Sequence, residues 1–487
     1  MNKKFNLFLA LMVFTGVSQA QWQPDVRLTN NPANSVTSFN SGWCIASSGN
    51  TLHVVWYDDR DGNEEIYYKR STDEGTSWST DTRLTNNPQS SENPSVAVSG
   101  ANIHVAWHDD RDGNLEIYYK RSTDGGLTWG TDTRLSNSPG MSARPSVAVS
   151  GTEVQVTWDD DRDGNWEIHH KRSTDGGSIW GADTRLTNDP GASNLPSVSI
   201  SGSNVHLVWD DTRDGNDEIY YKRSTDGGAT WGADIRLTNN SFASYYPSVA
   251  VSGANIHVVW YDGRDGNFEI YYKRSTDGGA SWGTDTRLTN NPALSFYPSV
   301  AASGSNIHVV WEDQRDGNFE IYYKRSTDGG ISWGADTRLT NDNNGSFRSY
   351  VTVSGAYVHV VWYDGRDANA EIYYKRNPSG NPVGITNIGS GIPGEFSLSQ
   401  NYPNPFNPVT VIKYQIPKSS YVSIKIYDQL GRETQALFDG LQQAGFYQAT
   451  FDGTNYASGI YFCRITVRQA GSTTEDFAKV IKLSLIK

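Results

Sequence analysis

The residues best suited to chemistry are aspartates, an arginine and a glutamate that recur in one short motif. The stretch from Trp311 to Glu320 reads W-E-D-Q-R-D-G-N-F-E, and its arginine returns every 51 residues, at Arg60, Arg111, Arg162, Arg213, Arg264, Arg315 and Arg366. Carboxylates beside a guanidinium could act in acid–base catalysis, and oxygens at Asp59, Asp61 and Asn63 could suit calcium. A group present in every unit, however, is a poor candidate for one unique active site.

The calcium interpretation is weakened by variation at its first position. Asp59 is replaced in later units by Thr212, Gly263, Gln314 and Gly365. We therefore interpret the motif as an arginine held by carboxylates at a tight Asp-Gly turn. No cofactor is expected, and calcium remains the open alternative.

A constant spacing of this length is typical of repeat architectures, in which each unit is one supersecondary element. One unit supplies four short runs rich in Val, Ile, Tyr, Trp and Thr, separated by Ser-Gly, Asp-Gly-Asn and Asp-Gly-Gly turns: Pro94–Gly100, Asn102–Trp107, Glu116–Ser122 and Asp132–Ser136. This pattern predicts a four-stranded antiparallel meander with strands A to D. Strand B is apolar at nearly every residue, which indicates sheets stacked around an axis.

The number of units follows from the strand B tryptophan, which occurs seven times. The last unit stops after its strand C at Arg376, and the missing strand D is found spare at Asp25–Asn30. We therefore predict an all-β fold, a seven-bladed β-propeller of four-stranded blades closed by the N-terminal strand. Such closure leaves no long exposed edge.

The ends of the chain differ from the repeats. Residues 1–20 contain Lys3, Lys4, an apolar run and Ser18-Gln19-Ala20, which predicts a cleaved secretory signal peptide. The expected boundaries are then 21–376 for the propeller, 377–393 for a Gly/Pro/Ser-rich linker and 394–487 for a small Ig-like β-sandwich. No later stretch is long enough for a membrane span.

Charge and cysteine content exclude several functions. The net charge of −13 argues against nucleic acid or an anionic lipid surface as a partner. Cys44 and Cys463 fall in different predicted domains, and we interpret both as small buried hydrophobic residues.

Between strands C and D lies the motif S-T-D-x-G-x-x-W, as in Ser122 to Trp129. This motif resembles the Asp-box, or BNR repeat, of sialidase-like propellers. In that family it is a structural hairpin on the face away from the substrate. The resemblance therefore implies a structural role for Asp73, Asp124, Asp175, Asp226, Asp277 and Asp328.

A single ligand site in a ring of equal blades must be built from residues that differ between blades. The B to C and D to A loops are expected on one rim, opposite the Asp-boxes, and they carry unrepeated aromatic and arginine residues. The ligand-binding candidates are Trp166, Arg144, Tyr245, Tyr246, Phe268, Phe296, Tyr297, Phe319 and Arg348. Aromatic planes beside polar groups suit stacking on sugar rings. The alternative is that these loops vary freely and some aromatics pack between blades.

The resemblance to sialidases does not supply catalytic residues. Those enzymes need an arginine trio, a Tyr and Glu pair and an Asp acid/base, on six blades rather than seven. The early F/Y-R-I-P motif is absent, and the nearest N-terminal arginine is Arg27 in a repeated segment. Asp159, Asp210 and Glu312 are rim acids with no assigned partner. Catalytic residues are thus unknown, and whether the protein is an enzyme stays open.

The C-terminal segment contains N-Y-P-N-P-F-N-P-V-T from Asn401 and S-G-I-Y-F from Ser458. It resembles the type A sorting domain of type IX secretion, which implies the type IX machinery as a partner and a secreted or cell-surface location. A structural Ig-like module is the alternative.

Three functional hypotheses follow from the sequence. The first is a monomeric propeller that binds an extracellular glycan or another extracellular ligand on its rim. The second is a sialidase-like exo-glycosidase, and the third is a structural or adhesive scaffold.

Overall fold

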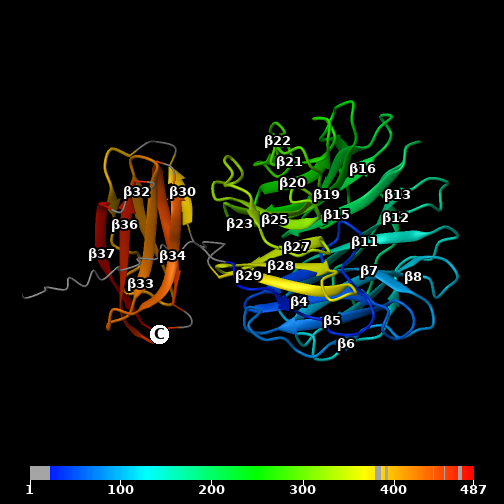
Figure 1. The fold of residues 1–487 in the computed structure, drawn as a ribbon, viewed down its shortest axis with the longest axis horizontal. Helices are drawn as coiled ribbons and strands as arrows, with labels where there is room; N and C mark the ends of the chain where they lie inside the picture. Colours follow the sequence, from blue (N-terminus) through cyan, green and yellow to red (C-terminus); the bar gives the residue numbers. More distant parts are fainter. Residues whose placement is uncertain are drawn as a thin grey trace, which may run out of the picture.

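The computed structural model describes residues 22–378, 385–389, 393–442, 444–453, 456–469 and 474–486. Its regular elements are all β-strands (Figure 1). No helix in the described part of the chain has the length and apolar character needed to cross a membrane. The predicted signal peptide, residues 1–20, and most of the predicted linker lie outside the described residues.

The second blade shows how one unit folds. Its strands are β7 (Ser91–Ser99), β8 (Asn102–Asp109), β9 (Glu116–Ser122) and β10 (Thr133–Arg134), in the order β10-β9-β8-β7. Strand C has the predicted bounds, strand B runs two residues further, and strand D has only two residues. Trp107 at the centre of β8 is completely buried, so the apolar character of strand B reflects cover on both faces.

The other blades repeat this order, and seven sheets account for β1 to β29. Blades 3 to 6 comprise β11 (Ser142–Ser150), β12 (Glu153–Asp160), β13 (Glu167–Ser173), β14 (Thr184–Arg185), β15 (Ser193–Ser201), β16 (Asn204–Asp211), β17 (Glu218–Ser224), β18 (Ile235–Arg236), β19 (Ser244–Ser252), β20 (Asn255–Asp262), β21 (Glu269–Ser275), β22 (Thr286–Arg287), β23 (Ser295–Ser303), β24 (Asn306–Asp313), β25 (Glu320–Ser326) and β26 (Thr337–Arg338). Blade 1 contains β2 (Ser35–Val36), β3 (Ile45–Ser48), β4 (Thr51–Asp58), β5 (Glu65–Ser71) and β6 (Thr82–Arg83).

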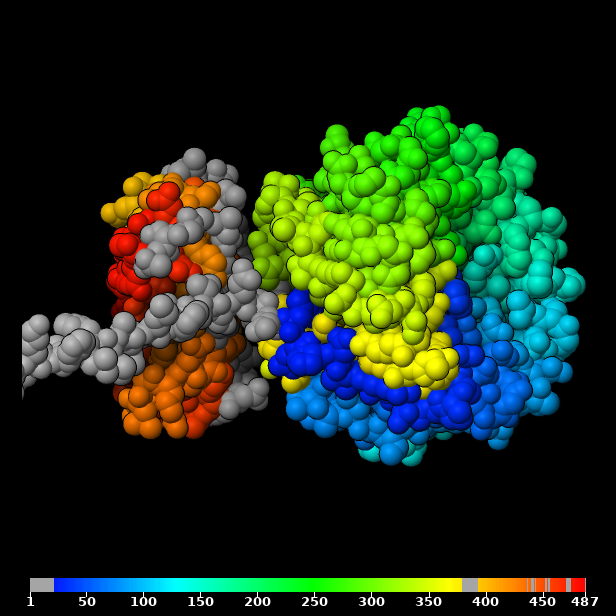
Figure 2. All heavy atoms as spheres, in the orientation of Figure 1, coloured from blue at the N-terminus to red at the C-terminus, as the bar shows by residue number. Residues whose placement is uncertain are grey.

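Blade 7 closes the ring as predicted. It combines β27 (Ser346–Ser354), β28 (Tyr357–Asp364) and β29 (Glu371–Asn377) with β1 (Val26–Arg27) from the other end of the propeller. Val26 faces Tyr374 in an antiparallel register, and the Leu28 amide donates to the Ile372 carbonyl at 2.7 Å. Figure 2 shows the blue N-terminal segment against the yellow atoms of this last blade. The seven-bladed fold is therefore confirmed.

Neighbouring blades are joined near the axis by a chain of serine hydroxyls. In blades 2 to 6, strand A has a bulge just before a serine, for example between Glu92 and Ser95 in blade 2. The serine hydroxyl then accepts the amide of the next blade at 3.2 to 3.3 Å, in the pairs Val147 to Ser95, Val198 to Ser146, Val249 to Ser197, Val300 to Ser248 and Val351 to Ser299. In blade 7 the serine position is occupied by Tyr350 and in blade 1 by Cys44. The series of serine hydrogen bonds is therefore interrupted where blades 7 and 1 meet, at the junction that we call the seam.

The Asp-box hairpins lie beside the A to B turns, since the Gly125 amide donates to the Ala101 carbonyl at 2.9 Å. Asp124 accepts hydrogen bonds from the amide and hydroxyl of Thr128, and these hold the pKa of Asp124 at about 2. Trp129 packs edge-on against Tyr68 of the preceding blade, with ring centroids 4.9 Å apart. These contacts are those of a structural hairpin that joins two blades.

The C-terminal domain is a two-sheet β-sandwich, as predicted, but residues 385–389, which were predicted to be linker, form its first strand, β30. One sheet has the order β30-β35-β32-β31 and the other β34-β33-β36-β37. The bounds are β30 (Ile385–Gly389), β31 (Ser397–Leu398), β32 (Val409–Ile416), β33 (Ser420–Tyr427), β34 (Glu433–Gln442), β35 (Gly445–Asp452), β36 (Gly459–Arg468) and β37 (Glu475–Leu485). Ile412, Ile424 and Ile465 are completely buried between the sheets. Cys463 lies in this core and Cys44 in the propeller core, both as free buried thiols.

The seam predicts a difference between two chemically identical substitutions. Asp25 in the N-terminal segment pairs with Arg366 and Lys375, each at 2.8 Å, and Asp132 pairs in the same way with Arg111 and Lys120 in blade 2. Asp25→Ala and Asp132→Ala should each lower the free energy of unfolding by about 1 to 3 kcal/mol in denaturant titrations.

Only Asp25→Ala should also release the N-terminal strand, because β10 is tethered to β9 by its own hairpin whereas β1 is not. Limited proteolysis with mass spectrometry should therefore detect early cleavage near residues 22–34 in Asp25→Ala alone. Equal resistance of the two variants would contradict this account of the closure.

Candidate functional site

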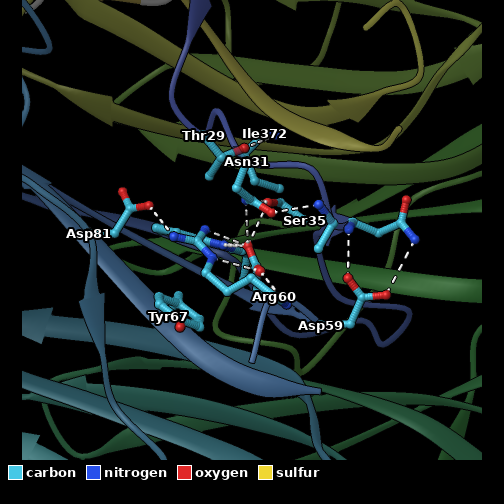
Figure 3. A network of polar contacts seen from close by, with 12 residues as sticks. Thr29, Asn31, Ser35, Asp59, Arg60, Tyr67, Asp81 and Ile372 are labelled. Atoms are coloured by element: carbon cyan, nitrogen blue, oxygen red, sulfur yellow. Dashed lines mark hydrogen bonds and ion pairs between the residues drawn. The ribbon is translucent and has the colours of Figure 1, made fainter. Parts of the chain in front are cut away.

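The repeated Asp-Arg motif forms an ion-paired turn at the end of each strand B (Figure 3). The Arg60 guanidinium donates to Asp58 at 2.5 and 2.7 Å and to Asp81 at 2.8 Å, and it lies over the Tyr67 ring at 4.3 Å. Burial opposes ionisation of Asp58, but hydrogen bonds from Arg60 and Ser35 outweigh it and keep the Asp58 pKa below its usual value. The motif is thus the carboxylate-held arginine that the sequence predicted.

The oxygens considered for calcium are used in separate contacts. Asp59 accepts the Asn34 amide at 2.6 Å, and Asp61 pairs with Arg83 at 3.1 Å. Asn63 turns its amide nitrogen, rather than its oxygen, toward the Gln89 carbonyl at 2.7 Å. No group of three or more His, Cys, Asp or Glu side chains in the described ranges is arranged to hold a metal ion.

The same contacts show that the B to C and D to A loops share one face, which we call the rim. Asn63 belongs to a B to C loop and Gln89 to the following D to A loop, and the Ser91 amide donates to the Glu64 carbonyl at 2.8 Å. Equivalent asparagine contacts recur in later blades, for example from Asn267 to the Ala293 carbonyl. All nine candidate residues lie in these loops or in the adjoining ends of the A strands.

Four of the candidates occupy a strained backbone position. In six blades the residue before the strand A proline, or before its replacement Ser349, is a non-glycine residue with φ between 49° and 53°: Asn93, Arg144, Leu195, Tyr246, Tyr297 and Arg348. Such left-handed conformations are rare outside glycine and cluster at bulges and functional sites. Three of these residues, Tyr246, Tyr297 and Arg348, line one pocket at the rim end of the A strands, which we call the mouth of the channel.

Six candidates form one continuous group over blades 5 and 6, which we call the aromatic arc. Its members are Tyr245, Tyr246, Phe268, Phe296, Tyr297 and Phe319, all partly exposed. Five of the six rings pack around the buried Tyr261 at centroid distances of 5.2 to 5.7 Å, and Phe319 joins through Phe296 at 6.1 Å. The arc is thus anchored by a core ring yet keeps exposed aromatic surface.

Arg348 is held at the inner end of the arc. Its guanidinium carbon lies 3.4 Å from the Tyr297 ring centroid and 4.7 Å from that of Phe39. Its backbone amide donates to Glu312 at 2.6 Å. Glu312 is almost completely buried, and this burial raises its pKa to about 7, although the Arg348 charge acts in the opposite direction.

The remaining candidates, Arg144 and Trp166, form a separate group on blade 3. Arg144 makes an ion pair with Asp159, and its guanidinium carbon lies 5.1 Å from the Trp166 ring centroid. Burial raises the pKa of Asp159 to about 6 and that of Asp210 well above its usual value. Each of these two aspartates has one buried oxygen without a hydrogen-bond partner. The structure therefore divides the nine candidates into the aromatic arc, Arg348 and the Arg144 group.

Sequence reasoning missed a loop that closes the channel on the rim side. Residues 37–42 reach across the mouth, where Asn40 donates to the Asn93 carbonyl at 3.1 Å and to the Pro145 carbonyl at 2.7 Å. The Tyr350 hydroxyl lies at 2.8 Å from the Ser38 carbonyl and 3.1 Å from the Asn40 carbonyl. A side chain at Gly42 would meet Ser95 and Pro145 at under 3 Å, so only glycine fits there. We call residues 37–42 the plug loop.

A signal for the plug loop exists in the spacing of the repeats. Asp25 and Asp81 are 56 residues apart, whereas later equivalents are 51 apart, so blade 1 carries five extra residues. With the plug loop in place, the pocket at the channel mouth has about 20 Å³ of free space, enough for about one water molecule. A group as large as a sugar ring does not fit in this pocket.

Comparisons with known proteins agree with this architecture. A family model described as a BNR repeat-like domain matches residues 11–258, and a model of a secretion system C-terminal sorting domain matches residues 400–481. No curated protein matches the chain.

Among solved structures, polysaccharide lyase Uly1 is similar at 10% identity, covering 73% of this chain and 99% of that chain, with a TM-score of 0.51. A Trypanosoma rangeli sialidase is similar at 11% identity, 83% and 89% coverage and a TM-score of 0.42. The α-L-arabinofuranosidase Arb93A from Fusarium graminearum is similar at 14% identity, 58% and 91% coverage and a TM-score of 0.43. At these identities the first likeness supports the fold alone.

The buried Glu312 predicts a pH-dependent stability. Because its folded-state pKa of about 7 lies above the ordinary value of 4.5, its contribution favours the folded state below pH 4.5 and is lost as the pH rises to about 7. Glu312→Gln should remove this loss. When the pH is raised from 5 to 7.5, the free energy of unfolding of the variant should therefore increase by roughly 2 to 3 kcal/mol relative to that of the natural protein. Denaturant titrations at both pH values measure the difference, and parallel curves for the two proteins would refute the assignment.

Proposed function

Because the chain belongs to the BNR repeat-like family and carries a C-terminal sorting domain of a secretion system, we propose that it is an exported glycan-binding protein. The ligand lies on the rim, across the aromatic arc and the Arg144 group. The sorting domain directs the protein to the extracellular or cell-surface space through the type IX machinery, after a signal peptide at residues 1–20.

The observation that carries this proposal is the exposed aromatic surface of the arc. Blades 1 and 2 have Glu64 and Leu115 at the loop position where blades 5 and 6 have Phe268 and Phe319. The apolar faces of sugar rings stack on such planes, and the neighbouring polar groups fix orientation through the hydroxyls. The anchoring by Tyr261 keeps the rings ordered before a ligand arrives, which lowers the entropy lost on binding.

Polar partners for sugar hydroxyls lie beside both groups of rings. Next to the arc, the Asp217 carboxyl group of blade 4 lies beside the Tyr245 hydroxyl. Next to Trp166 of blade 3, Arg144 lies between Asp159 and Asn194. Two stacking platforms separated by a polar stretch suit an extended oligosaccharide better than a single terminal sugar.

An exo-glycosidase is the second candidate, because the raised pKa values of Asp159 and Glu312 would suit a general acid. Both carboxyl groups are buried beneath an arginine, however, and the pocket beside Arg348 holds about one water molecule. A binding role requires no rearrangement of the plug loop and is therefore preferred. A structural or adhesive scaffold is the third candidate, and it predicts no ligand on the rim.

Substitution of one ring from each platform tests the binding role. Trp166→Ala and Phe319→Ala should each weaken the best-bound oligosaccharide of a glycan array by about tenfold, which corresponds to about 1.4 kcal/mol of lost stacking. Isothermal titration calorimetry measures the affinities. Leu115→Ala is the matched control, because Leu115 occupies the same loop position in a blade outside the arc.

Three results would count against the proposal. A blank array for the mature protein would favour the scaffold role, and unchanged affinity in both aromatic variants would place the ligand elsewhere. Release of 4-methylumbelliferone from fluorogenic glycosides by the same preparation would favour the exo-glycosidase.

Removal of residues 394–487 tests the route of export. The truncated chain should fold its propeller, whose blades are complete without the sandwich, but it should accumulate in the periplasm. Fractionation of the host cells with detection by antibody measures its location against the full chain. Undiminished appearance of the truncated chain outside the cell would show that another signal directs export.

A further inference from the structure

Resting on the proposed glycan-binding function, we propose that the rim selects uncharged glycans and excludes those that carry carboxylate or sulfate groups. Proteins bind anionic sugars through guanidinium groups that are free to make bidentate contacts. An anionic sugar can therefore be held on the rim only by an arginine whose N–H donors are not already paired with carboxylates of the protein.

The repeated arginines of the rim are already neutralised. Arg60 is held by Asp58 and Asp81, as Figure 3 shows for Arg60 and Asp81. The same pairing with two aspartates occurs for Arg111, Arg162, Arg213, Arg264, Arg315 and Arg366. A second set, in the D strands, is held by one glutamate and one aspartate each: Arg27, Arg83, Arg134, Arg185, Arg236, Arg287 and Arg338.

The two unrepeated arginines are engaged as well. Arg144 makes an ion pair with Asp159. The Arg348 side chain is only 12% exposed, because it lies against the rings of Tyr297 and Phe39 above the buried Glu312. Within residues 22–378, therefore, the repeated arginines of the rim and Arg144 already have carboxylate partners, and Arg348 is shielded from solvent by the surrounding rings.

Carboxylates also outnumber cations in the repeated network. Each blade contributes four carboxylates and three cations, in blade 1 Asp58, Asp61, Glu65 and Asp81 against Arg60, Lys69 and Arg83. The excess of about one negative charge per blade is fixed by residues that the fold itself requires. Further rim acids outside this network, Asp59, Glu64, Asp110, Asp161 and Asp217, add to it. An anionic ligand thus meets a field of its own sign.

Asp217 places a negative charge at the edge of the aromatic arc. It occupies the loop position that Phe268 and Phe319 occupy in the next two blades, and it lies beside Tyr245, a member of the arc. Its half-buried carboxyl group can accept a hydrogen bond from a sugar hydroxyl, whereas a ligand carboxylate or sulfate there would add repulsion without a donor. Discrimination therefore rests on the ligand's charge, while the stacking surface serves both classes equally.

The test compares glycans that share a backbone and differ in charge. Isothermal titration calorimetry of the full mature chain would use xylotetraose with its glucuronic-acid-branched counterpart, N-acetyllactosamine with its sialylated form, and agaro-oligosaccharide with carrageenan oligosaccharide. For each pair that binds, the neutral member should bind at least tenfold more tightly at low ionic strength. Raising the salt to 0.5 M should narrow this difference, because screening weakens repulsion.

Two variants localise the effect. Asp217→Asn should raise the ratio of anionic to neutral affinity about two- to fivefold, because the amide keeps an oxygen that can accept a sugar hydroxyl but carries no charge. Glu153→Asn is the matched control, because it removes one charge from the A to B turn on the opposite face and restores the asparagine found in blades 2 and 4. It should leave both members unchanged.

The possible failures are distinguishable. Equal or tighter binding of the anionic members, or affinity for them that falls as salt rises, would overturn the selectivity while leaving glycan binding intact. An absence of binding by any member would overturn the proposed function and this inference with it.

Discussion

The fold depends on an arginine held between two aspartates at the end of every strand B. In blade 1 the buried Asp58 accepts hydrogen bonds from the Arg60 guanidinium, the Trp56 indole and the Ser35 hydroxyl. Arg60 also donates to Asp81 beside strand D. One carboxylate thus ties together the core tryptophan, the turn and the incoming loop of the same blade. Loss of Arg60 would leave the completely buried Asp58 without a counter-charge, at a cost of about 3 to 5 kcal/mol.

This constraint explains why the repeat is so uniform and where it can vary. Residues that complete the ion-paired turn are fixed in all seven blades, so their charges are unavailable to a ligand. The bulge before each serine has no such partner requirement, and it carries Asn93, Leu195 or Tyr246 on the same left-handed backbone. Variation is therefore concentrated at the mouth of the channel, where different side chains meet.

The fold was predictable from the sequence because a 51-residue period fixes strand order, blade number and closure together. The candidate site was predictable only as a set of unrepeated residues. Comparison of equivalent positions in the seven repeats identifies Tyr245 and Phe268 as residues that differ. It does not show that both rings pack on Tyr261 in one arc, apart from Arg144. The five extra residues of blade 1 indicate an insertion, but they do not show what the plug loop or Tyr350 contacts, because those contacts join residues 53 to 312 apart along the chain. Neither local propensity nor periodicity identifies such partners.

The strand that closes the ring also sets the order in which the molecule can be completed. Arg27 and its partner Glu371 are separated by 344 residues, and bringing such distant points together costs about 5 kcal/mol of chain entropy. The first strand of the propeller to leave the ribosome is consequently the last to pair, and until then the edge of β29 stays open to strands of other molecules. For an exported protein, the interval before closure is the period of greatest risk of aggregation, and the seam is where a chaperone would protect it most effectively.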